Sequence, residues 1–140
     1  MRKEHVPKAP RKKDDIDFEI DFYERILKDT PNFIEALAAI GDLYTKAGYW
    51  QKGLAVDLKL TQLRGDDPII YYNLACSYAL LNQPRPALNA LCKAIECGYD
   101  DFAYLKSDAD LENLLKDNHF QAFIKDLEKK QKKKSSKSQA

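Results

Sequence analysis

Residues 71–81 read YYNLACSYALL and residues 86–98 read PALNALCKAIECG, and a weaker copy of both stretches lies upstream. The upstream copy reads LAAIGDLYTKAG over residues 37–48 and GLAVDLKL over residues 53–60. An offset of 34 residues aligns the two copies by side-chain size. A fixed period of this length predicts an array of repeated structural units.

Six aligned pairs of positions carry this repeat. Gly41 aligns with Ala75 and Gly53 with Ala87, so a small residue recurs at two places. The larger pairs are Leu37 with Tyr71, Ile40 with Leu74, Tyr44 with Tyr78, and Leu54 with Leu88. Small residues let two helices approach closely, while large neighbours fill the space beside the contact.

Apolar residues recur at spacings of three and four, which predicts helices rather than strands. The first such stripe predicts a helix over residues 14–30, and its members are Ile16, Ile20, Tyr23, Ile26 and Leu27. We therefore expect an all-α fold.

Residues that start and stop helices divide the chain further. Asn32 is expected to cap the second helix, with Glu35 three residues later answering the cap. Gly65 is expected to end the third helix in a left-handed turn. Asp67 and Pro68 are expected to open the fourth helix as its cap and its first residue.

Paired helices of about thirteen residues, repeating every 34 positions, resemble the tetratricopeptide repeat. In place of that family's W-x2-L-G-x2-Y motif the chain has two sets of four residues: Leu37, Ile40, Gly41 and Tyr44, then Tyr71, Leu74, Ala75 and Tyr78. The motif's downstream small residue is matched by Gly53 and Ala87. The resemblance implies a right-handed α-α superhelix, or solenoid, similar to small bacterial-type members with a degenerate C-terminal cap.

The domain organisation follows from this resemblance. Two full repeats are expected at residues 34–67 and 68–101, after a leading helix at 14–30 and before capping helices at 102–128. The basic residues 1–13 and the Lys-rich residues 129–140 have too few apolar side chains to offset the entropy cost of ordering, so we expect both tails to be disordered. Ten basic and nineteen acidic residues remain in 14–124, which makes the body acidic.

Asp57 departs from the family pattern, which has a bulky apolar residue at the position that Leu91 occupies in the next repeat. We expect the third helix to turn slightly, so that Val56, Leu58 and Leu60 pack. Asp57 would then reach water or a tyrosine hydroxyl.

The sequence shows no pattern typical of catalysis, such as a nucleophile beside a base or a glycine-rich phosphate loop. The three cysteines lack the paired spacing of a zinc site, and acidic clusters at the predicted helix starts fit capping better than calcium binding. His119 opens the last predicted helix and is expected to cap it or face solvent. We expect no enzyme activity, cofactor or metal.

The resemblance implies a concave groove lined by the first helix of each hairpin, in which a peptide could lie. The residues it places there are Glu35, Ala38, Asp42, Thr45, Lys46, Ile69, Tyr72, Asn73, Cys76, Ala79 and Leu80. Replacing Tyr72 by Ala, or reversing the charge at Asp42, is expected to weaken partner capture without unfolding the protein. The groove could instead be a solvated face, or be occupied by the chain's own closing helix.

The expected function is a non-catalytic adaptor whose groove binds a basic or apolar protein segment, because the body is acidic. Binding of a heat-shock chaperone tail is not expected: Asn73 matches one position of the family's carboxylate clamp, but Ala38 and Asp42 replace its Lys and Asn.

Two alternatives stay open. One is a secretion or assembly chaperone that shields an apolar client segment. The other is association with nucleic acid through the basic tails, which we do not expect because the tails lack aromatic residues for base stacking. The chain has no run of eighteen apolar residues and no apolar stretch typical of a secretory signal, so a cytoplasmic protein without a membrane segment is expected. The sequence does not indicate an oligomeric state.

Overall fold

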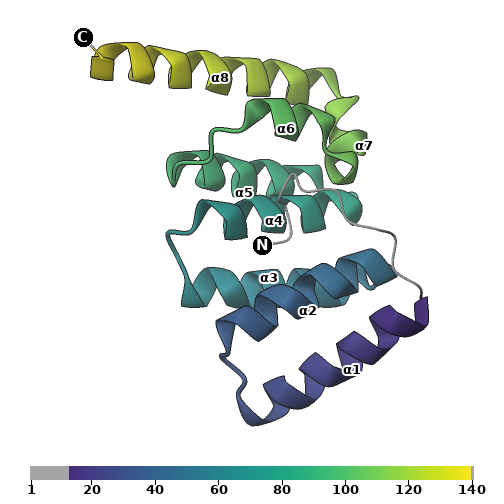
Figure 1. Cartoon of the computed structure of the whole chain (residues 1–140). Coiled ribbons are helices and arrows are strands. Elements are labelled where there is room, and N and C mark those ends of the chain that lie inside the picture. Colours follow the sequence, from purple (N-terminus) through teal and green to yellow (C-terminus); the bar gives the residue numbers. More distant parts are fainter. Residues whose placement is uncertain (1–12, 140) are drawn as a thin grey trace. The chain divides into compact units, whose positions relative to one another are not determined.

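The computed structural model describes residues 13–139, and every regular element in this range is helical (Figure 1). An all-α fold is therefore confirmed for the described residues. The chain divides into two compact units, Met1–Tyr99 and Asp100–Ala140. Residues 1–12 of the predicted basic tail lie outside the described residues, whereas Lys13 already belongs to the first helix.

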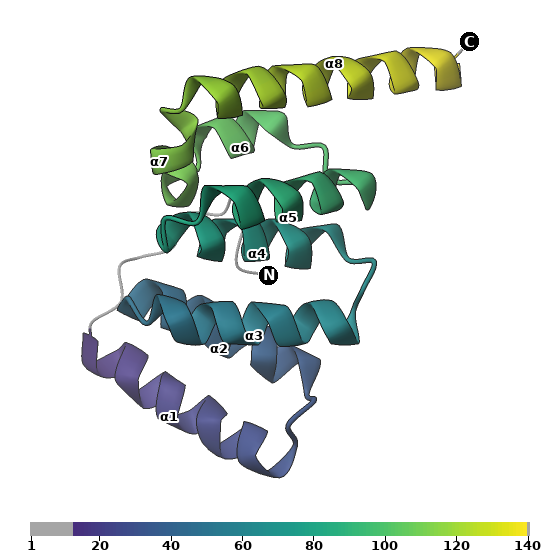
Figure 2. The same ribbon diagram turned by 180° about the vertical axis from the view of Figure 1, so that it is seen from behind.

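Five helices build the first unit from residue 13 onward, and each packs against the next one along the chain. They are α1 (Lys13–Asp29), α2 (Ile34–Ala47), α3 (Trp50–Leu63), α4 (Pro68–Leu80) and α5 (Pro84–Glu96). Consecutive helices run antiparallel, as the two opposite views show (Figures 1 and 2). The starts of α2 and α4 are 34 residues apart, and so are the starts of α3 and α5. The backbone therefore repeats with the period of the sequence.

Several helix ends follow the expected local chemistry. Asp67 caps α4, because its Oδ1 accepts hydrogen bonds from the backbone N–H of Ile69 (2.9 Å) and of Ile70 (3.4 Å). Pro68 is the first residue of that helix, where its missing N–H costs nothing. Gly48 ends α2 with φ +85°, a left-handed conformation that glycine adopts without strain.

Two predicted caps are wrong. The N-cap of α2 is Phe33 and no side chain caps this helix, since the preceding residues form a turn in which the Phe33 N–H donates to the Thr30 carbonyl at 3.2 Å. Helix α3 ends at Leu63 with Arg64 as its C-cap, and Gly65 does not adopt the left-handed conformation. The chain leaves α3 through a tight turn, with the Asp67 N–H donating to the Arg64 carbonyl at 3.3 Å, and this turn delivers Asp67 directly to its capping position.

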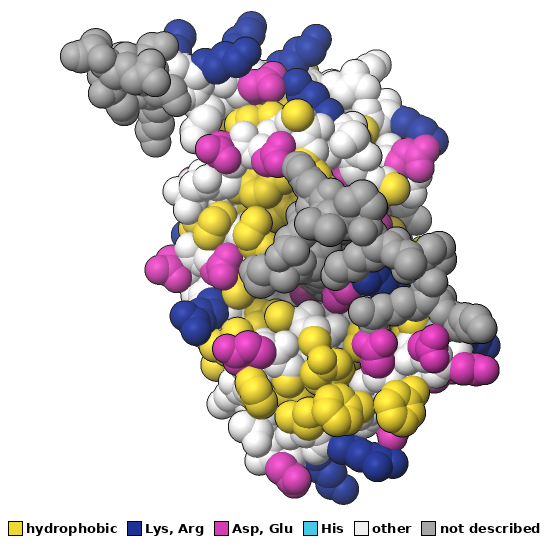
Figure 3. Space-filling view, viewed as in Figure 1, with side chains coloured by type: hydrophobic (Ala, Val, Ile, Leu, Met, Phe, Trp, Pro, Cys, Tyr) yellow, Lys and Arg dark blue, Asp and Glu magenta, His cyan; other side chains and the backbone are white. Residues whose placement is uncertain are grey.

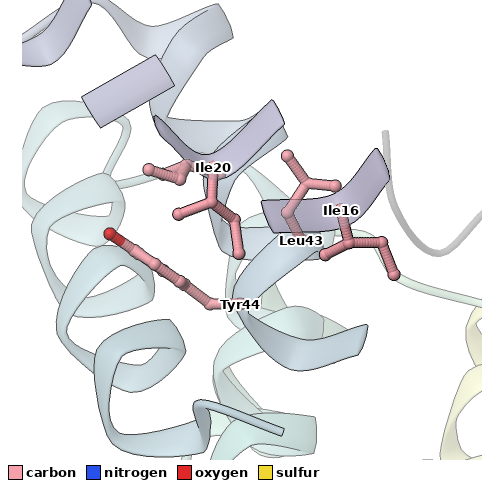
Figure 4. Packing of buried hydrophobic residues seen from close by; sticks show 5 residues of the cluster. Ile16, Ile20, Leu43 and Tyr44 are labelled. Atoms are coloured by element: carbon pink, nitrogen blue, oxygen red, sulfur yellow. The ribbon is translucent and has the colours of Figure 1, made fainter. Parts of the chain in front are cut away.

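Two apolar clusters belong to the core of the first unit, which also contains buried apolar side chains of α4 and α5 such as Leu74 and Leu91. In the first, Ile16 and Ile20 of α1 pack against α2, as Figure 4 shows. Its buried members are Ile16, Ile20, Ile40, Leu43 and Tyr44. In the second, Leu37, Leu60 and Ile70 join α2, α3 and α4. Val56 and Leu27 pack against both clusters, and each buried aliphatic side chain contributes roughly 1.5–3 kcal/mol to stability.

The crossing of α2 and α3 depends on a small residue at position 53. A Cβ atom at Gly53 would lie 3.2 Å from Thr45 Oγ1, 3.8 Å from the Gly41 carbonyl oxygen and 3.9 Å from Tyr44 Cβ. Helix α3 therefore rests almost directly on the backbone of α2. Ala75 and Ala87, the counterparts in α4 and α5, are each 1% exposed.

Asp57 lies in the core between α3 and α4, so the expectation that it would reach water is wrong. Its side chain is 1% exposed, and its Oδ2 accepts a hydrogen bond from Ser77 Oγ at 2.5 Å. Leu58, which was expected to pack, is 39% exposed. This hydrogen bond thus links α3 to α4, that is, the helix pair α2–α3 to the helix pair α4–α5, across twenty residues of sequence.

The second unit contains α6 (Phe102–Ser107), the 3₁₀ helix η1 (Ala109–Leu111), α7 (Glu112–Leu115) and α8 (Asn118–Gln139). Acidic side chains cap its helices as expected, because Asp101 accepts from the Tyr104 N–H at 3.1 Å and Asp108 from the Asp110 N–H at 3.0 Å. Lys106 Nζ pairs with Glu128 at 3.0 Å and ties α6 to α8. The buried apolar side chains of this unit among the described residues are Phe102, Leu105, Leu111, Leu114, Phe120 and Ile124.

Helix α8 continues to Gln139. We expected residues 129–140 to be disordered, whereas the structure has a helix over residues 129–139. No Pro or Gly interrupts this segment, and lysine and glutamine have good helix propensity. Lys130 pairs with Asp126 one turn earlier at 3.2 Å. The C-terminal end of α8 is therefore set by helix propensity, and the helix does not stop where apolar residues stop.

Replacing Ala87 by Leu should lower the free energy of unfolding by about 1–3 kcal/mol, because the added atoms must displace closely packed neighbours. Urea unfolding followed by circular dichroism measures this. Ala55→Leu, at an exposed position of α3, is the matched control and should change stability little. Equal stability of the two variants would contradict the close packing of α5.

Replacing Ser77 by Ala should lower the free energy of unfolding by about 1–3 kcal/mol, since a buried carboxylate loses a hydrogen-bond donor. Adding Asp57→Leu to this variant should restore part of the loss, because both polar groups are then removed from the core. A double-mutant cycle by urea unfolding tests the coupling. Additive losses in the cycle would show that the two side chains do not interact.

Candidate protein-binding surface

The predicted groove residues on α2 lie at the surface, but their charges are largely balanced. Glu35 is exposed and Ala38 is half-buried. Asp42 Oδ2 pairs with Lys46 Nζ at 2.7 Å, so these two residues present a neutral pair. Thr45 Oγ1 donates to the Gly41 carbonyl at 3.0 Å, within its own helix. Glu35 is therefore the predicted groove residue of α2 whose carboxylate is most open to solvent.

The predicted groove residues on α4 are mostly buried. Tyr72 is 0% exposed and stacks on Tyr99, with ring centroids 4.4 Å apart and an interplanar angle of 16°. Asn73, Cys76 and Ala79 are also buried, whereas Ile69 and Leu80 are half-buried. A Tyr72→Ala variant would open a cavity in the core, contrary to the expectation that it would spare the fold.

Asn73 keeps one unused polar atom on α4. Its side chain is 6% exposed, and its Oδ1 has no hydrogen-bond partner among the described residues. A buried amide oxygen normally accepts at least one hydrogen bond. This acceptor lies on the helix that the resemblance places in the groove.

The residues of the repeat signature lie inside the first unit or at its edge. Leu37, Ile40, Gly41, Tyr44, Gly53, Leu74, Ala75 and Ala87 are buried, while Tyr71 and Tyr78 are half-buried. Tyr71 donates its hydroxyl to the Gly65 carbonyl at 3.2 Å, and Lys93 Nζ lies 6.0 Å from the centre of its ring. These positions therefore hold helices together and leave recognition to other side chains.

Six large apolar side chains in the described residues are exposed, and none of them was predicted from the sequence to be a surface feature. They are Phe18 (73% exposed), Phe22 (52%), Phe33 (42%), Tyr49 (46%), Trp50 (39%) and Leu58 (39%). A signal for the first pair does exist, since Phe18 and Phe22 lie four residues apart on a side of α1 that Ile16 and Ile20 do not occupy.

The exposed pair on α1 has acidic surroundings. Hydrophobic side chains gather in the part of the space-filling view where Figure 1 places α1 and α2, with acidic side chains around them and Lys or Arg side chains along the lower edge (Figure 3). Asp21 pairs with Arg25 at 3.0 Å, and both side chains are largely exposed. Phe22 meets the ring of Tyr23 edge to face, with centroids 5.2 Å apart. This surface therefore combines fixed aromatic rings with negative charge.

The turn between α2 and α3 carries a second aromatic group, with a cation beside it. Tyr44 and Tyr49 meet edge to face with centroids 6.4 Å apart, and Lys52 Nζ lies 5.6 Å from the centre of each ring. Trp50 follows Tyr49 at this turn. The two aromatic groups of the first unit thus differ in the sign of the adjacent charge.

Tyr44 also links α2 to α1 through a carboxylate. Burial raises the pKa of its phenol above the ordinary value, and the nearby charge and hydrogen-bonding carboxylate of Glu24 raise the pKa further. The neutral phenol, which donates to Glu24, is therefore the form that the folded protein favours.

No protein-family model matches the chain. A stretch of 57 residues is 44% identical to a chloroplastic protein of Arabidopsis thaliana. The matched stretch is 41% of this chain and 17% of the Arabidopsis protein, so the chain spans only a small part of that relative. A match of this extent does not assign the chain to a family.

Among the described residues, each helix is either too short or too polar to cross a lipid bilayer.

Stability should depend on the protonation of Tyr44 at alkaline pH. Because its pKa is raised in the folded state, the stabilisation is complete below pH 10 and is lost as pH rises through the folded pKa. The free energy of unfolding of the wild type should therefore fall more steeply above pH 10 than that of Tyr44→Phe. Urea unfolding between about pH 8 and pH 11 measures both slopes. Tyr49→Phe, at an exposed position, is the control, and identical slopes for all three proteins would contradict the assignment.

Proposed function

We propose that the chain is a non-catalytic interaction module that binds a segment of another protein. The observation that carries this proposal is the exposure of large apolar side chains, with Phe18 at 73% and Phe22 at 52%. Adjacent exposed aromatic residues are a common feature of protein-binding surfaces, because their burial supplies most of the binding energy.

The proposal includes the tetratricopeptide-like architecture. It is supported by the helix starts that recur after 34 residues and by the close approach of Gly53 to the backbone of α2. In such a solenoid a partner segment lies across the first helices of the hairpins. Glu35 and the half-buried Ala38 of α2 would meet it, and the exposed carboxylate favours a basic partner.

The secretion or assembly chaperone is the alternative that the exposed phenylalanines also favour, since shielding an apolar client segment requires an apolar surface. A chaperone would bind many apolar segments with similar affinity, whereas an adaptor would select one. Specificity across unrelated clients therefore separates the two functions.

Association with a polyanion is a further candidate, and the observation that favours it is α8. Lys125, Lys129, Lys130, Lys132 and Lys133 of this helix are exposed. Exposed lysines attract phosphate backbones in a salt-dependent way. A helix without aromatic residues in this part offers no platform for bases, so this candidate ranks below protein binding.

The cellular compartment stays a prediction. A cytoplasmic location was expected from the sequence, but the partly matching Arabidopsis protein is described as chloroplastic. The 57 matched residues therefore give no support to a cytoplasmic location for this chain.

Affinity capture with the tagged full chain, quantified by mass spectrometry, tests the proposed function. We expect the wild type to enrich a discrete partner, and Glu35→Lys combined with Asp42→Lys to recover several-fold less of it. The reduction follows because both changes reverse charge on the exposed side of α2.

The matched control replaces Asp66 and Glu96, two exposed acidic residues elsewhere in the first unit, by Lys. Circular dichroism verifies that both double variants fold. Equal recovery by the two double variants would place the binding surface outside α2. No enrichment over the tag alone would count against the interaction module itself.

A further inference from the structure

We propose that the side of α1 that carries Phe18, Phe22 and Ile26, here named the α1 outer face, docks an amphipathic helix of a partner protein whose apolar stripe is flanked by Lys or Arg. This inference deepens the proposed function, on which it rests, by naming a surface and the chemistry of its occupant.

Helix α1 carries two apolar stripes rather than one. The inner stripe includes Ile16 and Ile20, which are 9% and 7% exposed and pack in the first core cluster. The outer stripe contains Phe18 and Phe22, followed four residues later by the half-buried Ile26. A surface helix of a globular protein normally has one apolar stripe, which faces the core, so a second apolar stripe on a charged helix is unusual. The second stripe of α1 thus has the composition of a packing face.

The outer stripe is held in place by the core beneath it. The ring of Phe22 meets Tyr23 at an interplanar angle of 76°, and Tyr23 in turn packs against the first core cluster. An aromatic ring that is already fixed loses little conformational entropy when a partner covers it. Phe22 is therefore a preorganised anchor, and the more exposed Phe18 lies one turn away.

Charge selects the occupant. Helix α1 contains three basic and seven acidic side chains, which gives a formal charge of −4. Asp15 and Asp29 are exposed near the two ends of the outer stripe. A second copy of α1 would bring −4 against −4, and like charges across an interface are unfavourable. A partner with Lys or Arg beside its apolar stripe matches both the aromatic and the acidic side chains.

The spacing of the stripe selects a helix rather than a strand. Residues at i, i+4 and i+8 form a ridge that fits the groove of a second helix. Strand addition requires the open edge of a sheet, and the described residues contain none. The chain's own basic residues 1–12 contain Pro7 and Pro10, which a continuous docking helix does not accommodate.

The test uses the full chain and a synthetic peptide of Leu and Lys, about 18 residues long, with its leucines at helical spacing. Fluorescence anisotropy of the labelled peptide should give saturable binding. Phe18→Ser combined with Phe22→Ser should weaken this binding at least about tenfold, because the two anchors supply most of the affinity. Backbone amide shifts in NMR spectra should locate the peptide on α1.

Matched controls separate this surface from general stickiness. Leu58→Ser combined with Trp50→Ala removes two exposed apolar side chains from α3 and should leave binding unchanged. Asp15→Lys combined with Asp29→Lys should weaken binding and make it less sensitive to salt. A peptide with Ser in place of Leu, or Glu in place of Lys, should not bind. Circular dichroism verifies that each variant folds.

Equal affinity of the wild type and the Phe18/Phe22 variant for the peptide would overturn the inference. So would light scattering that shows a dimer which this variant abolishes, because the occupant would then be a second copy. If the Phe18/Phe22 variant captures its cellular partner normally while the Glu35/Asp42 variant does not, the α1 outer face is wrong and the proposed interaction module stands. If the wild type enriches no partner at all, the proposed function fails as well.

Discussion

The close approach of consecutive helices over small residues is the constraint on which the first unit depends. At Gly53 the backbone of α3 comes so near to α2 that even a methyl group would press on Thr45. Only at this separation do Leu37 and Leu60 form one cluster with Ile70 of α4. A wider separation would leave gaps between α2 and α3. Gaps lower the free energy of unfolding, because both hydrophobic burial and dispersion contacts are lost. The small residues therefore determine which large residues can form a core.

This architecture also determines what remains for recognition. The core uses the inward stripe of each helix, and the residues that define the repeat are buried or half-buried in it. Recognition falls to side chains that the packing pattern does not need, such as Phe18 and Phe22. Helices in the interior of the first unit have a neighbour on either side, whereas α1 packs mainly on α2. Helix α1 therefore keeps the largest exposed apolar surface.

The sequence predicted what local chemistry and periodicity control. The all-α class followed from apolar spacings of three and four, and the start of α4 followed from Asp67 and Pro68, because both features are set within a few residues. The failures involve distant partners or competing turns. The Asp57 side chain accepts a hydrogen bond from the Ser77 hydroxyl, and Tyr72 stacks on Tyr99. In each pair the two residues lie twenty or more positions apart in the chain. The cap expected in the α1–α2 connection was displaced by a turn that uses backbone groups alone. Spacing within one repeat carries no information about such contacts.

The buried pair of Asp57 and Ser77 makes the joint between the two hairpins chemically unlike any other position in the repeat, since Leu91 stands where a second Asp57 would be. Hairpins of similar length and packing can stack in the wrong order or exchange between chains. Any arrangement that set α3 against a helix lacking the hydroxyl would deprive a buried carboxylate of a donor, at a cost of about 1–3 kcal/mol. The contact between Asp57 and Ser77 thus favours one order of the two helix pairs. It acts mainly by destabilising misassembled forms during folding rather than by stabilising the correct one.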